Sequence, residues 1–182
     1  MTQSIMMDLE TLSTETNAVI LSLGAVKFDD TSLKIDRDRS IYLKFDIDQQ
    51  TATLNRDISD NTMKWWKKQS LDSPEIVESA FSTDDRKSVE ECLDELSKFC
   101  WNAGYIWSQG SFDVNIMEHL YQQMDRPAPW RYYQICDSRT LFNFVDGSLD
   151  RSNHHDALED AISQASGVQR ALRRIGWRGV KL

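Results

Sequence analysis

The chain of 182 residues has few cysteines, and their arrangement excludes several classes of protein. Cys92, Cys100 and Cys136 are an odd number and lack a CxxC spacing, so neither a disulfide framework nor a structural zinc site is expected. A reducing cytoplasm is therefore the expected location. The sequence also has no apolar run of about 18 residues and no basic segment followed by an apolar stretch at its start. We therefore expect neither a membrane-spanning segment nor a signal peptide.

Several common catalytic signatures are also missing, and positive charge is scarce. No GxxxxGK, GxGxxG or GxSxG motif occurs, which excludes the usual nucleotide-binding and serine-hydrolase sites. Lys and Arg number 21 against 29 Asp and Glu, giving a net charge of −8. This balance argues against a protein that coats nucleic acid by neutralising phosphates. It does not argue against an enzyme that meets phosphates through metal ions held by carboxylates.

The residues that are present favour one folded domain of the α/β class. Hydrophobic residues make up 40% of the chain, and no linker or repeat divides it, so we expect a single domain over residues 1–182. Apolar and alternating segments predict three strands joined by hairpins, then strands alternating with helices. The predicted strands are 4–8, 18–28, 41–47, 105–108 and 132–136, and the predicted helices are 62–69, 89–100, 113–124, 138–145 and 157–175. The order βββαβαβα predicts a mixed five-stranded sheet with helices on both faces.

Three short motifs place acidic side chains near the ends of these elements. Asp8 and Glu10 lie two residues apart at the end of the first strand, so they share a face. Asp113 opens a predicted helix directly after a strand. Asp160 lies near the start of the last helix, five residues after His155, and the two converge only if His155 lies on the loop side of the helix start. Taken singly, the three motifs are more typical of a polar strand end, a helix cap and an acidic first turn, respectively.

Taken together, the four carboxylates need a reason to lie close to one another. Two unit negative charges about 4 Å apart repel by roughly 4 kcal/mol at an effective dielectric constant of about 20. A pair of divalent cations removes that repulsion, and oxygen ligands favour Mg²⁺ or Mn²⁺ over zinc. Two such ions can hold the attacking and leaving oxygens of a phosphodiester, and a neutral imidazole can take a proton from water. The combination therefore favours hydrolysis of nucleic acid.

The ordered motifs resemble a known family of nucleases. Asp8-x-Glu10-Thr11, Phe112-Asp113 and His155-x-x-x-x-Asp160 are similar to the DEDDh 3′–5′ exonucleases of the ribonuclease H-like superfamily. The segment 137–141 (DSRTL) and Trp65-Trp66-x-x-Gln69 are similar to one branch, which includes mycobacterial-type exoribonucleases and phage exonucleases. The resemblance extends over residues 5–176.

This resemblance implies roles for individual residues. Asp8, Glu10, Asp113 and Asp160 would ligate two ions of Mg²⁺ or Mn²⁺, and His155 would be the general base. The neighbouring His154 pairs with Glu159 at the same spacing, but only His155 has an Asp as its partner, as in the family. The substrate-binding residues expected beside the carboxylates are Thr11, Leu12 and Trp66.

The implied activity is hydrolysis from the 3′ end of single-stranded nucleic acid, with release of nucleoside 5′-monophosphates. The sequence leaves DNA and RNA open as substrates, and the resemblance also allows a homodimer. Two alternatives stay open: an endonuclease of the same superfamily, and a catalytically silent module that binds nucleic acid.

Two further features have both a functional and a structural interpretation. Trp65 and Trp66 lie on a predicted helix and cannot both face the core, because the side chains of adjacent helical residues point about 100° apart. One is expected in the core, and the other would stack on a base or form a rim over the site, with Trp66 assigned to the substrate. Two basic clusters, at 64–68 and from Arg170 onward, would guide phosphates or simply face solvent.

Overall fold

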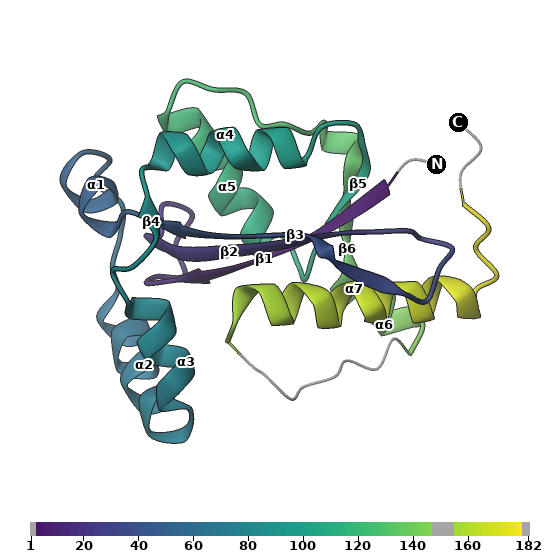
Figure 1. Ribbon diagram of the computed structural model, residues 1–182, viewed down its shortest axis with the longest axis horizontal. Helices are drawn as coiled ribbons and strands as arrows, with labels where there is room; N and C mark the ends of the chain where they lie inside the picture. Colours follow the sequence, from purple (N-terminus) through teal and green to yellow (C-terminus); the bar gives the residue numbers. More distant parts are fainter. Residues whose placement is uncertain (1–2, 147–154, 180–182) are drawn as a thin grey trace.

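A mixed sheet forms the centre of the protein in the computed structural model, which describes residues 3–146 and 155–179 (Figure 1). Among these residues the sheet has six strands in the order β4-β3-β2-β1-β5-β6. The strands β1, β2 and β3 pair antiparallel, whereas β5 pairs parallel to β1 and β6 parallel to β5. The strand bounds are β1 Gln3–Thr11, β2 Ile20–Phe28, β3 Ile35–Phe45, β4 Arg86–Lys87, β5 Ala103–Ser108 and β6 Ile135–Asp137.

The predicted α/β class and the three antiparallel strands are confirmed, but the sheet has six strands rather than five. The additional strand, β4, has two residues, which is too short for an alternating pattern to show. The strand predicted over 132–136 is wrong in its first half, because Tyr132–Gln134 form a 3-10 helix and β6 begins at Ile135.

Two helices were not predicted. The chain leaves β3 at Phe45 and enters α1, Ile47–Ala52, because the Asp46 side chain accepts a hydrogen bond from the Gln49 amide at 2.9 Å and caps it. Pro74 opens α3, Pro74–Phe81, where its missing amide hydrogen costs nothing because the first turn of a helix has no partner for it. The helices predicted elsewhere are α2 Asp60–Asp72, α4 Val89–Phe99, α5 Phe112–Gln123, α6 Ser138–Phe144 and α7 Ala157–Arg174.

Helices cover both faces of the sheet, and β1 supplies side chains to both. In Figure 1, α4 and α5 lie on one face and α7 lies along the other. Ile5, Met7 and Leu9 belong to the apolar cluster that includes side chains of α4 and α5. Met6 belongs to the cluster that includes α7. Because side chains alternate along a strand, Asp8 and Glu10 project to the same face as Met6, which is the face of α7.

A close approach between β2 and the start of α7 fixes where that helix begins. Gly24 of β2 pairs with Asp8 of β1. A Cβ atom at Gly24 would lie 2.3 Å from backbone atoms of both Ala157 and Leu158. The absence of a side chain at Gly24 therefore lets the first turn of α7 lie directly on the sheet, beside the carboxylate of Asp8.

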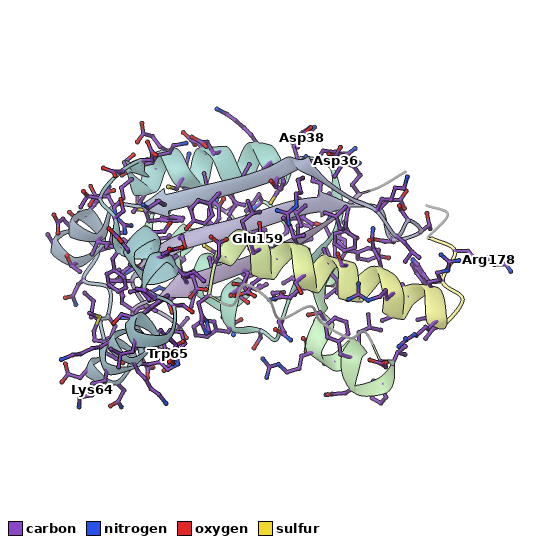
Figure 2. All side chains as sticks on the ribbon, turned by 60° about the horizontal axis from the view of Figure 1, so that its bottom comes forward. Asp36, Asp38, Lys64, Trp65, Glu159 and Arg178 are labelled. Atoms are coloured by element: carbon purple, nitrogen blue, oxygen red, sulfur yellow. The ribbon has the colours of Figure 1, made fainter. Side chains whose placement is uncertain are left out.

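The two basic clusters lie far apart. Figure 2 shows Lys64 on α2 at one end of the molecule and Arg178, beyond α7, at the other. They therefore do not form one continuous basic surface. Within the described residues, no helix combines the length and the apolar character needed to cross a membrane.

Candidate active site

The carboxylates of β1 lie under the first turns of α7. The carboxylate of Asp8 accepts a hydrogen bond of 2.8 Å from the Gln164 amide of α7. Glu10 is only 8% exposed and lies at the end of β1, where the pairing with β2 shifts register between Glu10 and Thr11. Both side chains share one face of the strand, as predicted, and the strand continues to Thr11 rather than ending at Asp8.

Asp113 approaches from the other side of β1, at the first turn of α5. It is 4% exposed, and its Oδ1 accepts a hydrogen bond of 3.1 Å from the backbone amide of Leu9. The turn before it contains Gly110, at a positive φ of 96°, whose amide donates to Asp137 Oδ1 at 2.8 Å. Asp137 also caps α6 by accepting from the Arg139 amide, so one carboxylate joins α6 to the turn that carries Asp113.

His155 and Asp160 meet at the start of α7. Asp156 is the N-cap, and His155 precedes it in the left-handed region with φ of 73°. The backbone amide of His155 donates to Asp160 Oδ2 at 2.9 Å. His155 therefore lies on the loop side of the helix start, which is the condition under which the two side chains converge. His154 lies outside the described residues.

One acid from β1 and the two residues at the start of α7 could hold a metal ion. Glu10, His155 and Asp160 each offer a ligand atom, and these atoms lie within 4.8 Å of one another. Asp8 and Asp113 complete the acidic cluster around them. The four carboxylates are the oxygen ligands that hard divalent cations such as Mg²⁺ and Mn²⁺ prefer, and the imidazole of His155 lies beside them.

The electrostatics of the cluster are those of crowded, buried acids. Burial, together with the negative charges of Asp160 and Asp113, raises the pKa of Glu10 to about 8. Burial likewise raises the pKa of Asp113 to about 7, against hydrogen bonds from backbone amides that lower it. The pKa of Asp8 also lies well above its usual value, through burial and the neighbouring carboxylates Asp113 and Glu10. Without cations, this cluster resists full ionisation.

A cavity of about 740 Å³ opens beside Glu10. Its lining includes the exposed faces of Trp65 and Phe112, which are 38% and 36% exposed. The remaining lining residues are largely polar, and none of the lining residues is Lys or Arg: Leu9, Glu10, Thr11, Ser13, Thr14, Glu15, Asp57, Ser59, Asn61 and Thr62. The volume suits a ligand of the size of one nucleotide.

The assignment of Trp66 to the substrate is wrong. Trp66 is 1% exposed, packs in the apolar cluster with Leu12, and donates its indole N–H to the Thr11 carbonyl at 2.9 Å. Trp65 is the tryptophan at the site: its ring lies edge-on to His155, with 4.7 Å between centroids. Figure 2 shows Trp65 on α2, across from Glu159 at the start of α7.

Of the other two predicted substrate residues, Thr11 lines the cavity and Leu12 does not. Leu12 is 3% exposed, so its side chain serves the core.

Two residues of the site, Gln164 and Asp57, lie outside the motifs from which the site was predicted. Gln164 follows Asp160 by four residues, and helical spacing places both on one side of α7, so this partner of Asp8 could have been found. Asp57 lines the cavity and accepts a hydrogen bond of 2.5 Å from the hydroxyl of Ser13. The two are 44 residues apart and no periodicity connects them, so only the folded chain reveals the pair.

Two solved structures illustrate the similarity of the fold. Pop2p of S. pombe, in a Mg²⁺- and Mn²⁺-bound form, matches with a TM-score of 0.64 at 11% identity, covering 98% of this chain and 86% of that one. The cell-death related nuclease CRN-4 matches with a TM-score of 0.51 at 16% identity, covering 96% of this chain and 64% of that one. At such low identities these matches establish the fold. Comparison with curated protein sequences finds no match.

One family model matches almost the whole sequence. The model of the Rv2179c-like 3′–5′ exoribonuclease domain matches residues 3–172, which contain all four carboxylates, His155 and the cavity. The chain therefore belongs to the Rv2179c-like 3′–5′ exoribonuclease domain family and is a 3′–5′ exonuclease with a ribonuclease H-like fold.

Proposed function

We propose that the protein removes nucleotides from the 3′ end of single-stranded RNA, with two divalent cations, and releases nucleoside 5′-monophosphates. The observation that carries this proposal is the convergence of ligand atoms of Glu10, His155 and Asp160 within 4.8 Å, where Glu10 also lines a cavity of nucleotide size. The family description supports RNA as the substrate, and the Mg²⁺- and Mn²⁺-bound form of Pop2p supports the same two metals here.

Each residue of the cluster has a defined task in this proposal. Asp8, Glu10, Asp113 and Asp160 would hold the cations, since the crowding that raises the pKa values of Asp8, Glu10 and Asp113 is relieved by bound positive charge. Bound divalent cations supply Lewis-acid stabilisation of the charge that develops on the phosphate oxygens.

His155 is the only imidazole among the described residues of the cluster. A ring nitrogen of His155 takes the proton from the attacking water, and the hydrogen bond from its backbone amide to Asp160 fixes its position beside the cluster. The edge-on contact with Trp65 limits the orientations that the ring can adopt.

The negative charge of the cavity lining favours a free 3′-hydroxyl at the end of the substrate. The cavity that begins at Glu10 accepts one terminal nucleotide, and Glu10, Glu15 and Asp57 give it a negative lining. A terminal 3′-phosphate would be repelled there, whereas a free 3′-hydroxyl would not. Blocking the 3′ end should therefore slow hydrolysis strongly, and blocking the 5′ end should not.

The test is an activity panel with matched RNA and DNA oligonucleotides, single- and double-stranded, labelled at the 5′ end and incubated with Mg²⁺. We expect single-stranded RNA to shorten in a ladder from its 3′ end. Internal cuts would identify an endonuclease, and faster hydrolysis of DNA would overturn the assignment of RNA. Intact substrate in every lane would leave the silent nucleic-acid-binding module as the better interpretation.

A pair of histidine variants tests the general base. His155→Ala should lower kcat about 10²–10⁴-fold, which is the usual contribution of a general base, with little effect on Mn²⁺ affinity measured by calorimetry. His154→Ala is the matched control and should cost much less. If His154→Ala is the inactive variant, the assignment of the base is off by one residue.

A further inference from the structure

The lining of the cavity contains an acid that the proposed chemistry does not use. Asp57 lies in the segment between α1 and α2 and lines the cavity together with Ser13. Ser13 is fully buried, and its hydroxyl donates to Asp57 Oδ2 at 2.5 Å. No described residue donates a side-chain hydrogen bond to Asp57 Oδ1, so that oxygen keeps its lone pairs for a ligand.

This acid is held rigidly by the backbone around it. The Asp57 amide donates to the Asn17 carbonyl at 2.8 Å, and the Asp57 carbonyl accepts from the Val19 amide at 2.9 Å. Next to it, Arg56 is 4% exposed and donates to the Ala18 carbonyl at 2.8 Å. A carboxylate fixed in this way presents a hydrogen-bond acceptor at a defined point of the cavity wall. It loses little conformational entropy when it binds a ligand.

The short stretch of chain between Glu10 and Ser13 limits how far the Ser13–Asp57 pair can lie from the carboxylates. Ser13 follows Glu10 by three residues, a span of at most about 10 Å in an extended chain. A nucleotide with its phosphate at the carboxylates would place its sugar next and its base furthest from Glu10. The Ser13–Asp57 pair lines the same cavity as Trp65 and Phe112, within reach of a base whose phosphate lies at the carboxylates.

We propose that Asp57 selects the 3′-terminal base by accepting hydrogen bonds from its Watson–Crick edge, and that it favours guanine and disfavours uracil. This proposal rests on the proposed function of the site. Guanine presents two neighbouring N–H donors on that edge, which a carboxylate can accept together. Uracil presents one N–H between two carbonyl oxygens, and these oxygens are repelled by the carboxylate. Stacking on Trp65 or Phe112 would bind any base, so it would add affinity without choosing among them.

The substitution Asp57→Asn provides a sharp test because it conserves the shape of the side chain. Its amide oxygen can still accept from Ser13, while its NH₂ group replaces the acceptor that faces the cavity. We expect the wild-type protein to show kcat/KM about tenfold higher for a 3′-terminal guanine than for uracil, the factor expected for a charge-assisted hydrogen bond. In Asp57→Asn the preference for guanine should disappear, and hydrolysis of uracil ends should stay equal or become faster.

The assay uses four RNA oligonucleotides that differ only in the 3′-terminal base, with single-turnover rates for the removal of that nucleotide. Asp60→Asn is the matched control, since Asp60 opens α2 three residues away and does not line the cavity. Ser13→Ala, which keeps the carboxylate but removes its anchor, should retain the order of bases with a smaller difference. Thermal unfolding of each variant verifies that it is folded.

Several outcomes would overturn the role of Asp57. A wild-type protein without base preference would do so, and so would an equal slowing of all four substrates by Asp57→Asn, which indicates a purely structural role. Loss of discrimination against a terminal 2′-deoxy sugar, with the order of bases unchanged, would show that Asp57 contacts the ribose instead.

If no RNA is hydrolysed, the proposed function fails, but the cavity can still be tested. Calorimetric binding of the four nucleoside 5′-monophosphates with Mn²⁺ should then rank guanosine above uridine in the wild type and not in Asp57→Asn. An equal ranking in both proteins would overturn the role of Asp57.

Discussion

Replacing Gly24 by alanine should damage the active site without touching any of its polar groups. The added Cβ would lie 2.3 Å from the carbonyl carbon and oxygen of Ala157 and from the amide nitrogen of Leu158. Carbon atoms in contact are normally about 3.5–4.0 Å apart. All three atoms belong to the backbone, so no side-chain rotation can relieve the overlap, and the first turn of α7 must move away from the sheet by about 1 Å or more.

The size of the loss follows from what that turn carries. His155 and Asp160 would move with α7, while Asp8 and Glu10 would stay on β1. A misplacement of about 1 Å in a catalytic site can cost about 10²-fold in rate, so we expect kcat/KM of Gly24→Ala to fall by about that factor. Overpacking should also cost about 1–3 kcal/mol of stability, and each kcal/mol lowers the Tm by about 2–4 °C in a chain of this size.

The assay combines three measurements: hydrolysis of a 5′-labelled RNA, thermal unfolding, and calorimetry of Mn²⁺ binding. The calorimetry is carried out at a temperature at which the variant is folded. Weaker binding of Mn²⁺ by a folded Gly24→Ala protein would show that the carboxylates have been pulled apart. A variant with wild-type rate, Mn²⁺ affinity and Tm would refute the reasoning, because it would mean that α7 does not depend on the close approach at Gly24.

Three further predictions concern charge and packing. Asp8→Asn should abolish hydrolysis in Mg²⁺, yet leave the metal-free protein equally or more stable in a denaturant titration, because one of several crowded negative charges is gone; undiminished turnover would contradict its assignment as a ligand. Since the folded-state pKa values of Glu10 and Asp113, about 8 and 7, lie above their usual values of 4.5 and 3.8, the metal-free folded protein binds more protons than the unfolded chain between about pH 4 and 8. Its Tm should therefore fall as the pH rises through that window and recover on addition of Mg²⁺, and a Tm that rises instead would contradict the crowding of these acids. Trp66→Ala should cost about 3–5 kcal/mol of stability, whereas Trp65→Ala should mainly raise KM for RNA; the opposite pattern would invalidate the assignment of their faces.

The parts of the site that could be predicted are those governed by local periodicity. Asp8 and Glu10 share a face because strand side chains alternate, and that depends on no other part of the chain. The position of His155 ahead of the helix start could be stated as a condition for its meeting Asp160, and the cap at Asp156 satisfies that condition. The catalytic and ligand roles of these residues remain predictions.

The parts that could not be predicted depend on how distant segments cross. Trp65 and Trp66 differ by one residue, and α2 turns Trp66 into the cluster that contains Leu12, a choice that no local pattern encodes. The α1 helix was hidden because its first residue continued the alternation of the preceding strand, whereas the cap at Asp46 decides the outcome. The pair of Ser13 and Asp57 exists only because two loops run beside each other.

The order in which the site can assemble during folding follows from the topology of the sheet. The hairpins of β1, β2 and β3 join neighbours in the chain, so they can form early and already present Asp8 and Glu10. The parallel pairing of Ile5 with Ile106, which brings α5 and Asp113 to them, closes a loop of about a hundred residues, and such non-local contacts form slowly. The docking of α7 on β1 and β2 comes from still further along the chain. A folding intermediate that holds only the hairpins would therefore carry part of the acidic cluster without the residues that complete it, and nuclease activity should appear only with the last step of folding.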